Sequence, residues 1–277
     1  MSRSRHRGTP AKGGRRASRA SASAASSFPR PGRGPEVERT ARAARSVPAR
    51  ETRALGPSSG RAAGRRLRVL ITAGPTREHV DPVRYLTNES SGKMGFAIAE
   101  AAAAEGHEVV LIAGPVNLST PRRVHRVDVV SARELLDAAR REFRNCDALV
   151  MAAAVADWRP ARKLAAKWRA KDGGAERTTL ELVRNPDVLA TLTRGRRTPG
   201  KTVVAFALET GAGVARARRK LAKKGADWIV LNGPGALGGD RTSVTLLGAD
   251  GGRVELSNRT KREVAGEIVA LLGGAKR

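Results

Sequence analysis

The chain of 277 residues has a formal net charge of +27, because 53 Lys or Arg face 26 Asp or Glu. Such an excess attracts polyanions of every kind, phosphorylated small molecules as well as nucleic acid, so charge alone selects no partner. The single cysteine, Cys146, excludes an internal disulfide framework and a CxxC metal site, and no apolar stretch reaches the roughly 20 residues of a membrane helix. We therefore expect a cytoplasmic protein without a membrane partner.

Residues 1–66 differ from the rest of the chain in composition. They hold 17 Lys or Arg against 3 Glu, and most of the others are Ala, Ser, Gly or Pro. So few apolar residues cannot offset the entropy lost on ordering, which predicts a disordered basic extension. An organelle transit peptide and a translation start placed too far upstream are alternatives that the composition leaves open. With Phe28 as its one aromatic residue, the extension would bind nucleic acid only non-specifically.

From residue 67 to residue 277 we expect one α/β domain, a Rossmann-like, doubly wound and mainly parallel sheet with helices on both faces. Short apolar runs alternate there with alanine-rich helical stretches, which is typical of βα units. The expected strands are Arg68 to Thr72, Glu108 to Ala113, His125 to Val130, Ala148 to Ala153, Thr202 to Leu208 and Asp227 to Leu231. The expected helices are Lys93 to Glu105, Ala132 to Phe143, Pro186 to Thr193 and Val214 to Lys224.

The last third of the chain predicts an extension of this sheet. Two apolar runs, Ser243 to Leu247 and Arg253 to Leu256, flank the turn sequence Ala-Asp-Gly-Gly and predict a β-hairpin. An amphipathic helix is expected from Lys261 to Leu272, and the pair Gly273-Gly274 after it is a helix-ending signal.

Open α/β sheets bind ligands beyond the carboxyl ends of their strands, where the strand order reverses. The first such loop, Ala73-Gly-Pro-Thr-Arg, lacks the GxGxxG pattern, and the second expected strand ends at Ala113 without an acidic residue. The Tyr-x-x-x-Lys pair of short-chain dehydrogenases is missing too, because the residue four positions after Tyr85 is Glu89 rather than lysine. A Rossmann-type oxidoreductase therefore stays only as an alternative.

A phosphate site is predicted at the start of the first helix, where the sequence reads Thr87-Asn-Glu-Ser-Ser-Gly-Lys-Met-Gly. Ser90, Ser91 and Gly92 leave backbone N–H groups to face an anion, and the helix dipole and Lys93 add positive charge. An ordinary serine cap is the structural alternative. Asn88 lies just before this segment and offers one acceptor and two donors to a polar substrate.

A second cluster follows the fourth expected strand, in the run from Ala152 to Asp157. Small residues there leave room for a flat base or a ribose, and the Asp157 carboxylate can bind either of these or a cation. The alternative is an aspartate that merely ends a strand. The basic loop beyond it, with Lys163, Lys167 and Lys171, can act as an electrostatic clamp on phosphate charge, or can be a solvated charged surface.

Taken together, these segments resemble the bacterial type of the phosphopantothenoylcysteine synthetase family, the phosphopantothenate–cysteine ligases. The resemblance covers about 200 residues, and its motifs occur in the same order and at the same spacing as in the family. The matching segments are Ile71-Thr-Ala-Gly-Pro-Thr-Arg, Asp81-Pro-Val-Arg-Tyr, Asn88-Glu-Ser-Ser-Gly-Lys-Met-Gly-Phe, Ala153-Ala-Val-Ala-Asp, Arg184-Asn-Pro-Asp and Phe206-Ala-Leu-Glu-Thr.

The resemblance implies a ligase that joins 4'-phosphopantothenate to L-cysteine in coenzyme A biosynthesis. CTP would activate the carboxylate as an acyl-cytidylate with release of pyrophosphate, and Mg²⁺ would neutralise the triphosphate. Asn88 would hold the acyl-cytidylate, Lys167 would steady the triphosphate, and Asp157 would bind the metal. By the same resemblance the site residues that contact nucleotide and phosphate are Gly74, Ser90, Ser91, Gly92, Lys93, Ala153, Asp157, Arg184, Asn185, Pro186, Asp187, Phe206, Lys220 and Lys224.

This chain departs from the family at several positions. The basic loop reads Lys167-Trp-Arg-Ala-Lys171, so which of Lys163, Lys167 and Lys171 dominates stays open. Gly233 follows Asn232 where the family tends to have aspartate, and Ser243 stands where asparagine is common, with effects that the sequence does not settle. The preference for CTP over ATP rests on the resemblance alone.

Partners are likewise implied by the family. It forms homodimers, and the hairpin after Asn232 is the expected contact. The flavin-dependent decarboxylase domain that often precedes this domain in bacteria is not found in residues 1–66, which are too short and too polar for it. A separate decarboxylase is therefore a candidate partner.

Overall fold

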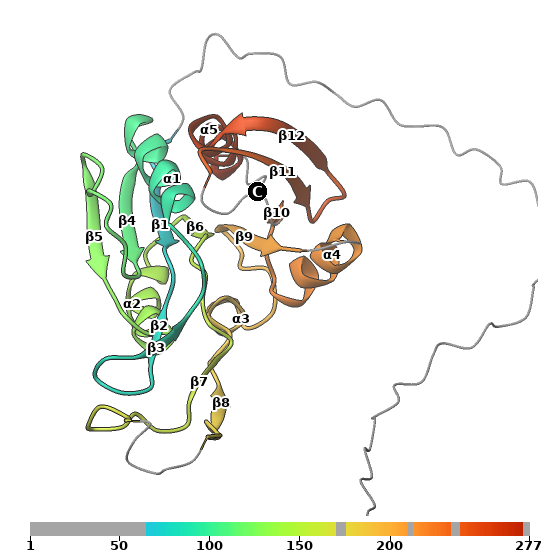
Figure 1. Ribbon diagram of the computed structural model, residues 1–277. Helices are drawn as coiled ribbons and strands as arrows, with labels where there is room; N and C mark the ends of the chain where they lie inside the picture. Colours follow the sequence, from blue (N-terminus) through green and yellow to red (C-terminus); the bar gives the residue numbers. More distant parts are fainter. Residues whose placement is uncertain (1–64, 170–175, 210–212, 234–238, 274–277) are drawn as a thin grey trace, which may run out of the picture. The chain divides into compact units, whose positions relative to one another are not determined.

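A computed structural model describes residues 65–169, 176–209, 213–233 and 239–273, and its central feature is an eight-stranded sheet (Figure 1). Six strands are parallel and lie in the order β10-β9-β6-β1-β4-β5, and β11 and β12 extend the β10 edge as antiparallel neighbours. The strands are β1 Arg68–Ala73, β4 Glu108–Ala113, β5 Val124–Asp128, β6 Ala148–Met151, β9 Thr202–Leu208, β10 Trp228–Asn232, β11 Arg241–Gly248 and β12 Arg253–Thr260.

The strand order reverses beside β1. The chain runs outward from β1 to β4 and β5, then returns to the other side of β1 to form β6, β9 and β10. β1 therefore pairs in parallel with both β4 and β6; Ile71, for example, stands opposite Leu111 on one side and Val150 on the other. Because ligands of doubly wound sheets bind at this reversal, the carboxyl ends of β1 and β6 mark the expected crevice.

Helices cover both faces of the sheet, as the sequence predicted. α1 (Lys93–Ala104) and α5 (Lys261–Leu272) pack on one face, and α2 (Ala132–Phe143), α3 (Val188–Thr193) and α4 (Gly213–Lys223) pack on the other. The central strands are apolar on both sides because both sides are buried. α1 lies very close to β1, since a Cβ atom on Gly95 would stand 2.5 Å from the Cβ of Ala73.

The predicted elements are confirmed, with shifts at their ends. The third expected strand is β5, which spans Val124–Asp128, and the fourth expected strand is β6, which spans Ala148–Met151. α3 begins at Val188 rather than Pro186, because the Asp187 carboxylate caps it by accepting a hydrogen bond from the Ala190 N–H at 3.1 Å. Gly273 ends α5 with a right-handed φ of −81°, and Gly274 lies outside the described residues.

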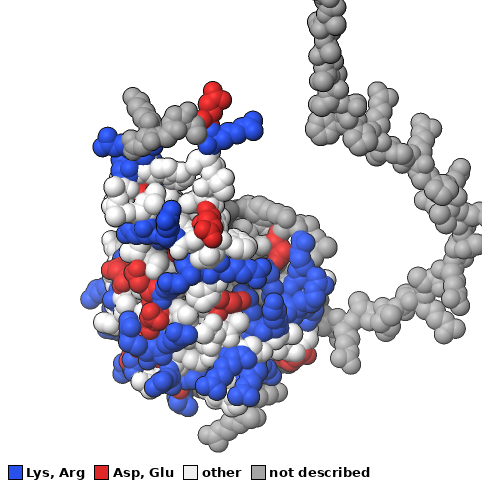
Figure 2. Space-filling model, turned by 90° about the horizontal axis from the view of Figure 1, so that it is seen from below, with Lys and Arg blue, Asp and Glu red and all other residues white. Residues whose placement is uncertain are grey.

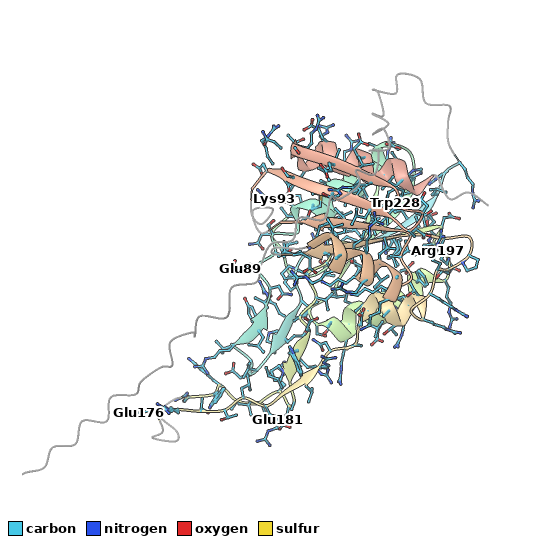
Figure 3. All side chains as sticks on the ribbon, turned by 90° about the vertical axis from the view of Figure 1, so that its right-hand side faces the viewer. Glu89, Lys93, Glu176, Glu181, Arg197 and Trp228 are labelled. Atoms are coloured by element: carbon cyan, nitrogen blue, oxygen red, sulfur yellow. The ribbon has the colours of Figure 1, made fainter. Side chains whose placement is uncertain are left out.

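Two small antiparallel hairpins were not predicted. β2 (Arg77–His79) pairs with β3 (Tyr85–Thr87), and β7 (Trp158–Pro160) pairs with β8 (Leu182–Arg184). In Figure 3 both project from the body on the side of the labelled Glu89 and Lys93, away from Trp228, the first residue of β10. They therefore extend from the carboxyl side of the sheet, where the site is expected.

Candidate functional site

Threonine hydroxyls join the segments that follow β1 and β6. The Thr72 hydroxyl accepts a hydrogen bond from the Ala153 N–H at 3.2 Å, and the Thr76 hydroxyl accepts one from the Ala156 N–H at 3.0 Å. Both threonines are fully buried. The loop after β1 is therefore fixed against the run from Ala153 to Asp157, and the two form one continuous surface at the switch point.

Asn88 is brought to this surface by β3. The Thr87 hydroxyl donates to the Thr76 carbonyl at 2.8 Å, and the Asn88 side-chain amide donates to the Ala154 carbonyl at 3.2 Å. The two clusters that the sequence singled out, around Asn88 and around Asp157, therefore lie next to each other.

The start of α1 is shaped by glycines rather than by a serine cap. Gly92 is the N-cap residue with φ +74°, no side chain caps the helix, and Ser90 Oγ accepts only a 3.4 Å hydrogen bond from the Gly92 N–H. A Cβ atom on Gly92 would lie 3.4 Å from the Cα of Gly74, which itself has φ +76°. The left-handed φ of both residues favours glycine, and the N–H groups at the start of α1, which no side chain caps, can face an anion.

Lys93 has a carboxylate partner that the sequence did not reveal. Its ammonium group lies 2.7 Å from the Asp240 carboxylate, and this hydrogen bond, with the accompanying charge attraction, lowers the pKa of Asp240. Beside them the buried Lys261 donates to the Gly239 carbonyl, and burial together with the charge of Lys93 lowers the pKa of Lys261. A phosphate at Lys93 would have to compete with Asp240, 147 residues away in sequence.

The segment after β8 lies against the Asp157 cluster. The Asn185 N–H donates to the Asp157 carbonyl at 2.8 Å, and the Asn185 side-chain amide donates to the Ala156 carbonyl at 2.8 Å. The Arg184 guanidinium stands 5.4 Å from the centre of the Trp158 ring, and the Asp157 carboxylate itself is exposed. Arg184 and Asn185 are therefore placed beside Asp157, and their contact with a nucleotide stays a prediction.

A cavity of about 550 Å³ opens beside this segment, between α2 and the β7–β8 hairpin. Its lining is rich in arginine and consists of Arg133, Leu136, Asp137, Arg140, Arg159, Arg184, Asn185 and Pro186. The Arg159 guanidinium donates to the Arg184 carbonyl and to the Asn185 side-chain oxygen, so three of the lining residues are joined to one another.

The predicted lysines of α4 contact different carboxylates. Lys220 lies 2.6 Å from Glu209, which also pairs with Arg216 at 2.8 Å, and the hydrogen bond from Lys220 lowers the pKa of Glu209. Lys224, just after the helix, lies 3.4 Å from Asp187. A phosphate would have to displace these partners to bind both lysines.

Phe206 is half-buried near the carboxyl end of β9, and its side chain packs against the cluster beneath α1 and α5. It lies two strands from β1 in the sheet order. The described contacts therefore place Phe206 at the same edge as the switch point but do not join it to Asn88 or Asp157.

The carboxylates of the described residues fit a cation that a nucleotide brings with it better than a metal centre built from protein ligands alone. Within the described ranges, no group of three or more His, Cys, Asp or Glu side chains could hold a metal ion. Mg²⁺ is commonly held by one or two carboxylates together with substrate phosphates. The exposed Asp157 carboxylate at the strand end fits that pattern.

The basic loop lies on the β2–β3 hairpin. The Leu164 N–H donates to the Val80 carbonyl at 2.8 Å, and the Trp168 N–H donates to the Asp81 carboxylate at 3.0 Å. Lys167 is exposed at the turn end of the hairpin, whereas Asn88 follows the opposite end of β3. No described contact joins these two residues, and Lys171 lies outside the described residues.

Lys and Arg outnumber acidic residues on the face drawn in Figure 2. That surplus favours phosphorylated ligands but does not single one out. No helix in the part of the chain that the structure describes has the length and apolar character to cross a bilayer.

Comparison with known proteins gives consistent matches. Residues 64–274 match the family described as DNA/pantothenate metabolism flavoprotein C-terminal domain. The Mycobacterium tuberculosis protein "Coenzyme A biosynthesis bifunctional protein CoaBC" is 44% identical over 219 residues, which cover 75% of this chain and 51% of that protein. Its Vibrio parahaemolyticus counterpart is 44% identical over 191 residues, covering 66% and 46%. The chain thus spans about half the length of the curated relatives it matches.

Solved structures agree with these sequence matches. The crystal structure of the C-terminal domain of a coenzyme A biosynthesis bifunctional protein CoaBC superposes with a TM-score of 0.64 at 40% identity, over 76% of this chain and 95% of that one. A Streptococcus pneumoniae DNA/pantothenate metabolism flavoprotein has the same fold, with a TM-score of 0.63 at 23% identity over 74% and 97%. This chain belongs to the family of DNA/pantothenate metabolism flavoprotein C-terminal domains.

Proposed function

We propose that this chain is a phosphopantothenate–cysteine ligase of coenzyme A biosynthesis that uses CTP. The observation that carries the proposal is the hydrogen bond from Asn88 to the Ala154 carbonyl. It joins the segment that leads into α1, where we place a phosphate, to the Asp157 cluster at the switch point of the sheet. Family membership and the relatives' role in coenzyme A biosynthesis support the same substrate class.

The first step of the proposed reaction activates the acid. A carboxylate oxygen of 4'-phosphopantothenate attacks the α-phosphorus of CTP, the bond to the β-phosphate oxygen breaks, and pyrophosphate leaves. The uncapped N–H groups of α1 would bind a phosphate, and Lys167 would neutralise charge that grows on the triphosphate. Mg²⁺ held by Asp157 would shield the same phosphates.

The second step forms the amide. The free amine of L-cysteine attacks the acyl carbon, the bond to the cytidylate oxygen breaks, CMP leaves, and the amine proton passes to solvent. One hydrogen of the Asn88 side-chain amide is donated to the Ala154 carbonyl, and the second can be donated to the acyl oxygen of the intermediate. An aspartate at this position could not donate, so the intermediate would be left without that support.

The decisive assay follows pyrophosphate release from CTP with 4'-phosphopantothenate and Mg²⁺, with and without L-cysteine. We expect release to require 4'-phosphopantothenate, and ATP in place of CTP to support a lower rate. Lys167→Gln should slow cytidylate formation about 100-fold, whereas Asn88→Asp should accumulate the cytidylate without amide. Wild-type rates in both variants would refute the site, and release without any acid would refute the reaction.

We also propose that the chain forms a homodimer, through the two small hairpins rather than through the hairpin after Asn232. Val83, Tyr85, Trp158 and Leu182 on the β2–β3 and β7–β8 hairpins are exposed by 38–58%, and they are four of the six exposed large apolar side chains among the described residues. β12 instead exposes mainly polar and charged residues. Light scattering should give a dimer that Val83→Asp with Trp158→Asp converts to a monomer and Glu255→Lys does not.

A further inference from the structure

Asp81 is a fully buried carboxylate in the turn of the β2–β3 hairpin. One oxygen accepts hydrogen bonds from the Val83 and Arg84 N–H groups at 2.7 Å each. The other accepts from the Arg84 guanidinium and from the Trp168 N–H, both at 3.0 Å. Four donors compensate the loss of water around the charge, so the carboxylate is stable in this buried position.

The electrostatics agree with this geometry. Burial raises the pKa of Asp81, but hydrogen bonds from the backbone of Trp168, Val83 and Arg84 outweigh that effect and bring the pKa to about 2. Asp81 is therefore ionised at neutral pH, and its acceptor capacity is used by the turn and by the basic loop.

The two oxygens serve different segments. The first closes the turn from Val80 to Arg84, and the second holds Trp168, which is 87 residues away in sequence. The Arg84 guanidinium also donates to the Trp168 carbonyl, and the Leu164 N–H donates to the Val80 carbonyl. The backbone on both sides of Lys167 is thereby tied to the hairpin, while the Lys167 side chain stays exposed.

We propose that Asp81 is a positioning residue that fixes the backbone at Lys167 and so sets where this ammonium group meets the nucleotide. The proposal rests on the proposed ligase function. A lysine on an untethered loop samples many positions, whereas a fixed backbone leaves the side chain fewer positions and lowers the entropic cost of meeting a phosphate. The Asp81 bond acts next to Lys167, whereas the backbone beside Lys163 is held by the separate bond from Leu164 to Val80.

Glu78 provides a matched control in the same hairpin. Its side chain is also buried, but it accepts a hydrogen bond from the Ala132 N–H at the start of α2 at 2.9 Å. Glu78→Gln therefore perturbs a buried carboxylate of the hairpin without touching the contact to the basic loop.

Hydrogen exchange tests the tie directly. Asparagine has one acceptor oxygen where aspartate has two, so Asp81→Asn cannot serve both the turn and Trp168. We expect the Trp168 amide to exchange about 10-fold faster in Asp81→Asn and at the wild-type rate in Glu78→Gln. Unchanged exchange at Trp168 in Asp81→Asn would overturn the proposal.

Kinetics test the role of the tie. Asp81→Asn should lower kcat for pyrophosphate release about 10-fold and leave the KM for CTP within about 2-fold, because the interaction lost acts on the transition state. In a Lys167→Gln background the same substitution should have little further effect, while with Lys163→Gln the two effects should multiply. An equal loss in the wild-type and Lys167→Gln backgrounds would mean a general structural defect and overturn the proposal.

A second pair of variants keeps the test valid if Asp81→Asn does not fold. Trp168→Pro removes the donor N–H, and Trp168→Ala keeps it while removing the indole. We expect the proline variant alone to show the loss in kcat, and equal losses in both would count against the tie. If the wild-type protein shows no release that depends on 4'-phosphopantothenate, the ligase function fails, and the exchange rate of Trp168 still decides whether Asp81 holds the loop.

Discussion

The central sheet and the two small hairpins are stabilised by different interactions. Strands β1, β4 and β6 are buried on both faces and pack through side chains such as Ile71, Leu111 and Leu149. The β2–β3 hairpin instead depends on Asp81 and Glu78, whose carboxylates accept hydrogen bonds from backbone groups far away in sequence. In the β7–β8 hairpin the Arg159 guanidinium donates to the Arg184 carbonyl and to the Asn185 side chain. The sheet therefore resists change by bulk burial, whereas each hairpin depends on a few individual hydrogen bonds.

The largest expected effect comes from removing a buried apolar side chain from the central sheet. Ile71→Ala should lower the free energy of unfolding by about 2–5 kcal/mol, because it leaves a cavity in a fully buried strand. Val83→Ala, on the exposed turn of the β2–β3 hairpin, should stay within about 0.5 kcal/mol of the wild type. Urea unfolding measures both values, and similar losses would break the distinction between the two regions.

The difference also explains what could be predicted from the sequence. Burial on both faces leaves apolar runs such as Glu108 to Ala113, so all six parallel strands could be predicted in their order along the chain. The roles of Asn88 and Asp157 stay predictions, although the structure places Asn88 against Ala154 in the run that ends at Asp157. The hairpins could not, since three-residue strands show no periodicity. Pairs such as Lys93 with Asp240 depend on contacts 147 residues apart, for which the local sequence gives no signal.

A second prediction concerns the loop where sheet and site meet. A Cβ atom on Gly114 would stand 1.8 Å from the Pro75 carbonyl oxygen, so Gly114→Ala must displace the loop after β1. We expect a loss of about 1–3 kcal/mol in thermal or urea unfolding and weaker CTP binding. Gly266→Ala, in open space within α5, should instead stabilise the protein by about 0.5–1 kcal/mol. If neither substitution changed the free energy of unfolding, the close contact at Gly114 and the open space at Gly266 would both be contradicted.

The third prediction addresses the start of α5, where a capping box joins Thr260 and Glu263. Thr260→Ala should cost about 1 kcal/mol, because a backbone N–H at the helix start loses its acceptor. Ser at the same position keeps the hydroxyl and should restore most of the stability. The free energy of unfolding in urea distinguishes these variants, and equal stability of Thr260→Ala and the wild type would show that the cap contributes nothing.

The smallest expected effect is the dependence of stability on pH. Hydrogen bonds from the backbone and hydroxyl of Thr260 bring the pKa of Glu263 to about 2, and the pKa of Asp81 is also about 2. Both pKa values lie below the ordinary values, which are 4.5 for Glu263 and 3.8 for Asp81. The two ionised carboxylates therefore stabilise the folded state fully above about pH 4.5, and this stabilisation is lost as the pH falls toward 2. Thermal unfolding should show this loss, with a shallower slope in Glu263→Gln; the same slope in both proteins would contradict the assignment.

The most direct measurement of the central claim is a crystal structure of the protein with CTP and 4'-phosphopantothenate. We predict density for both ligands at the carboxyl ends of β1 and β6, between Asn88 and Asp157, with a phosphate at the start of α1. A nucleotide bound on another face, with that space empty, would contradict the claim that these loops form one ligation site.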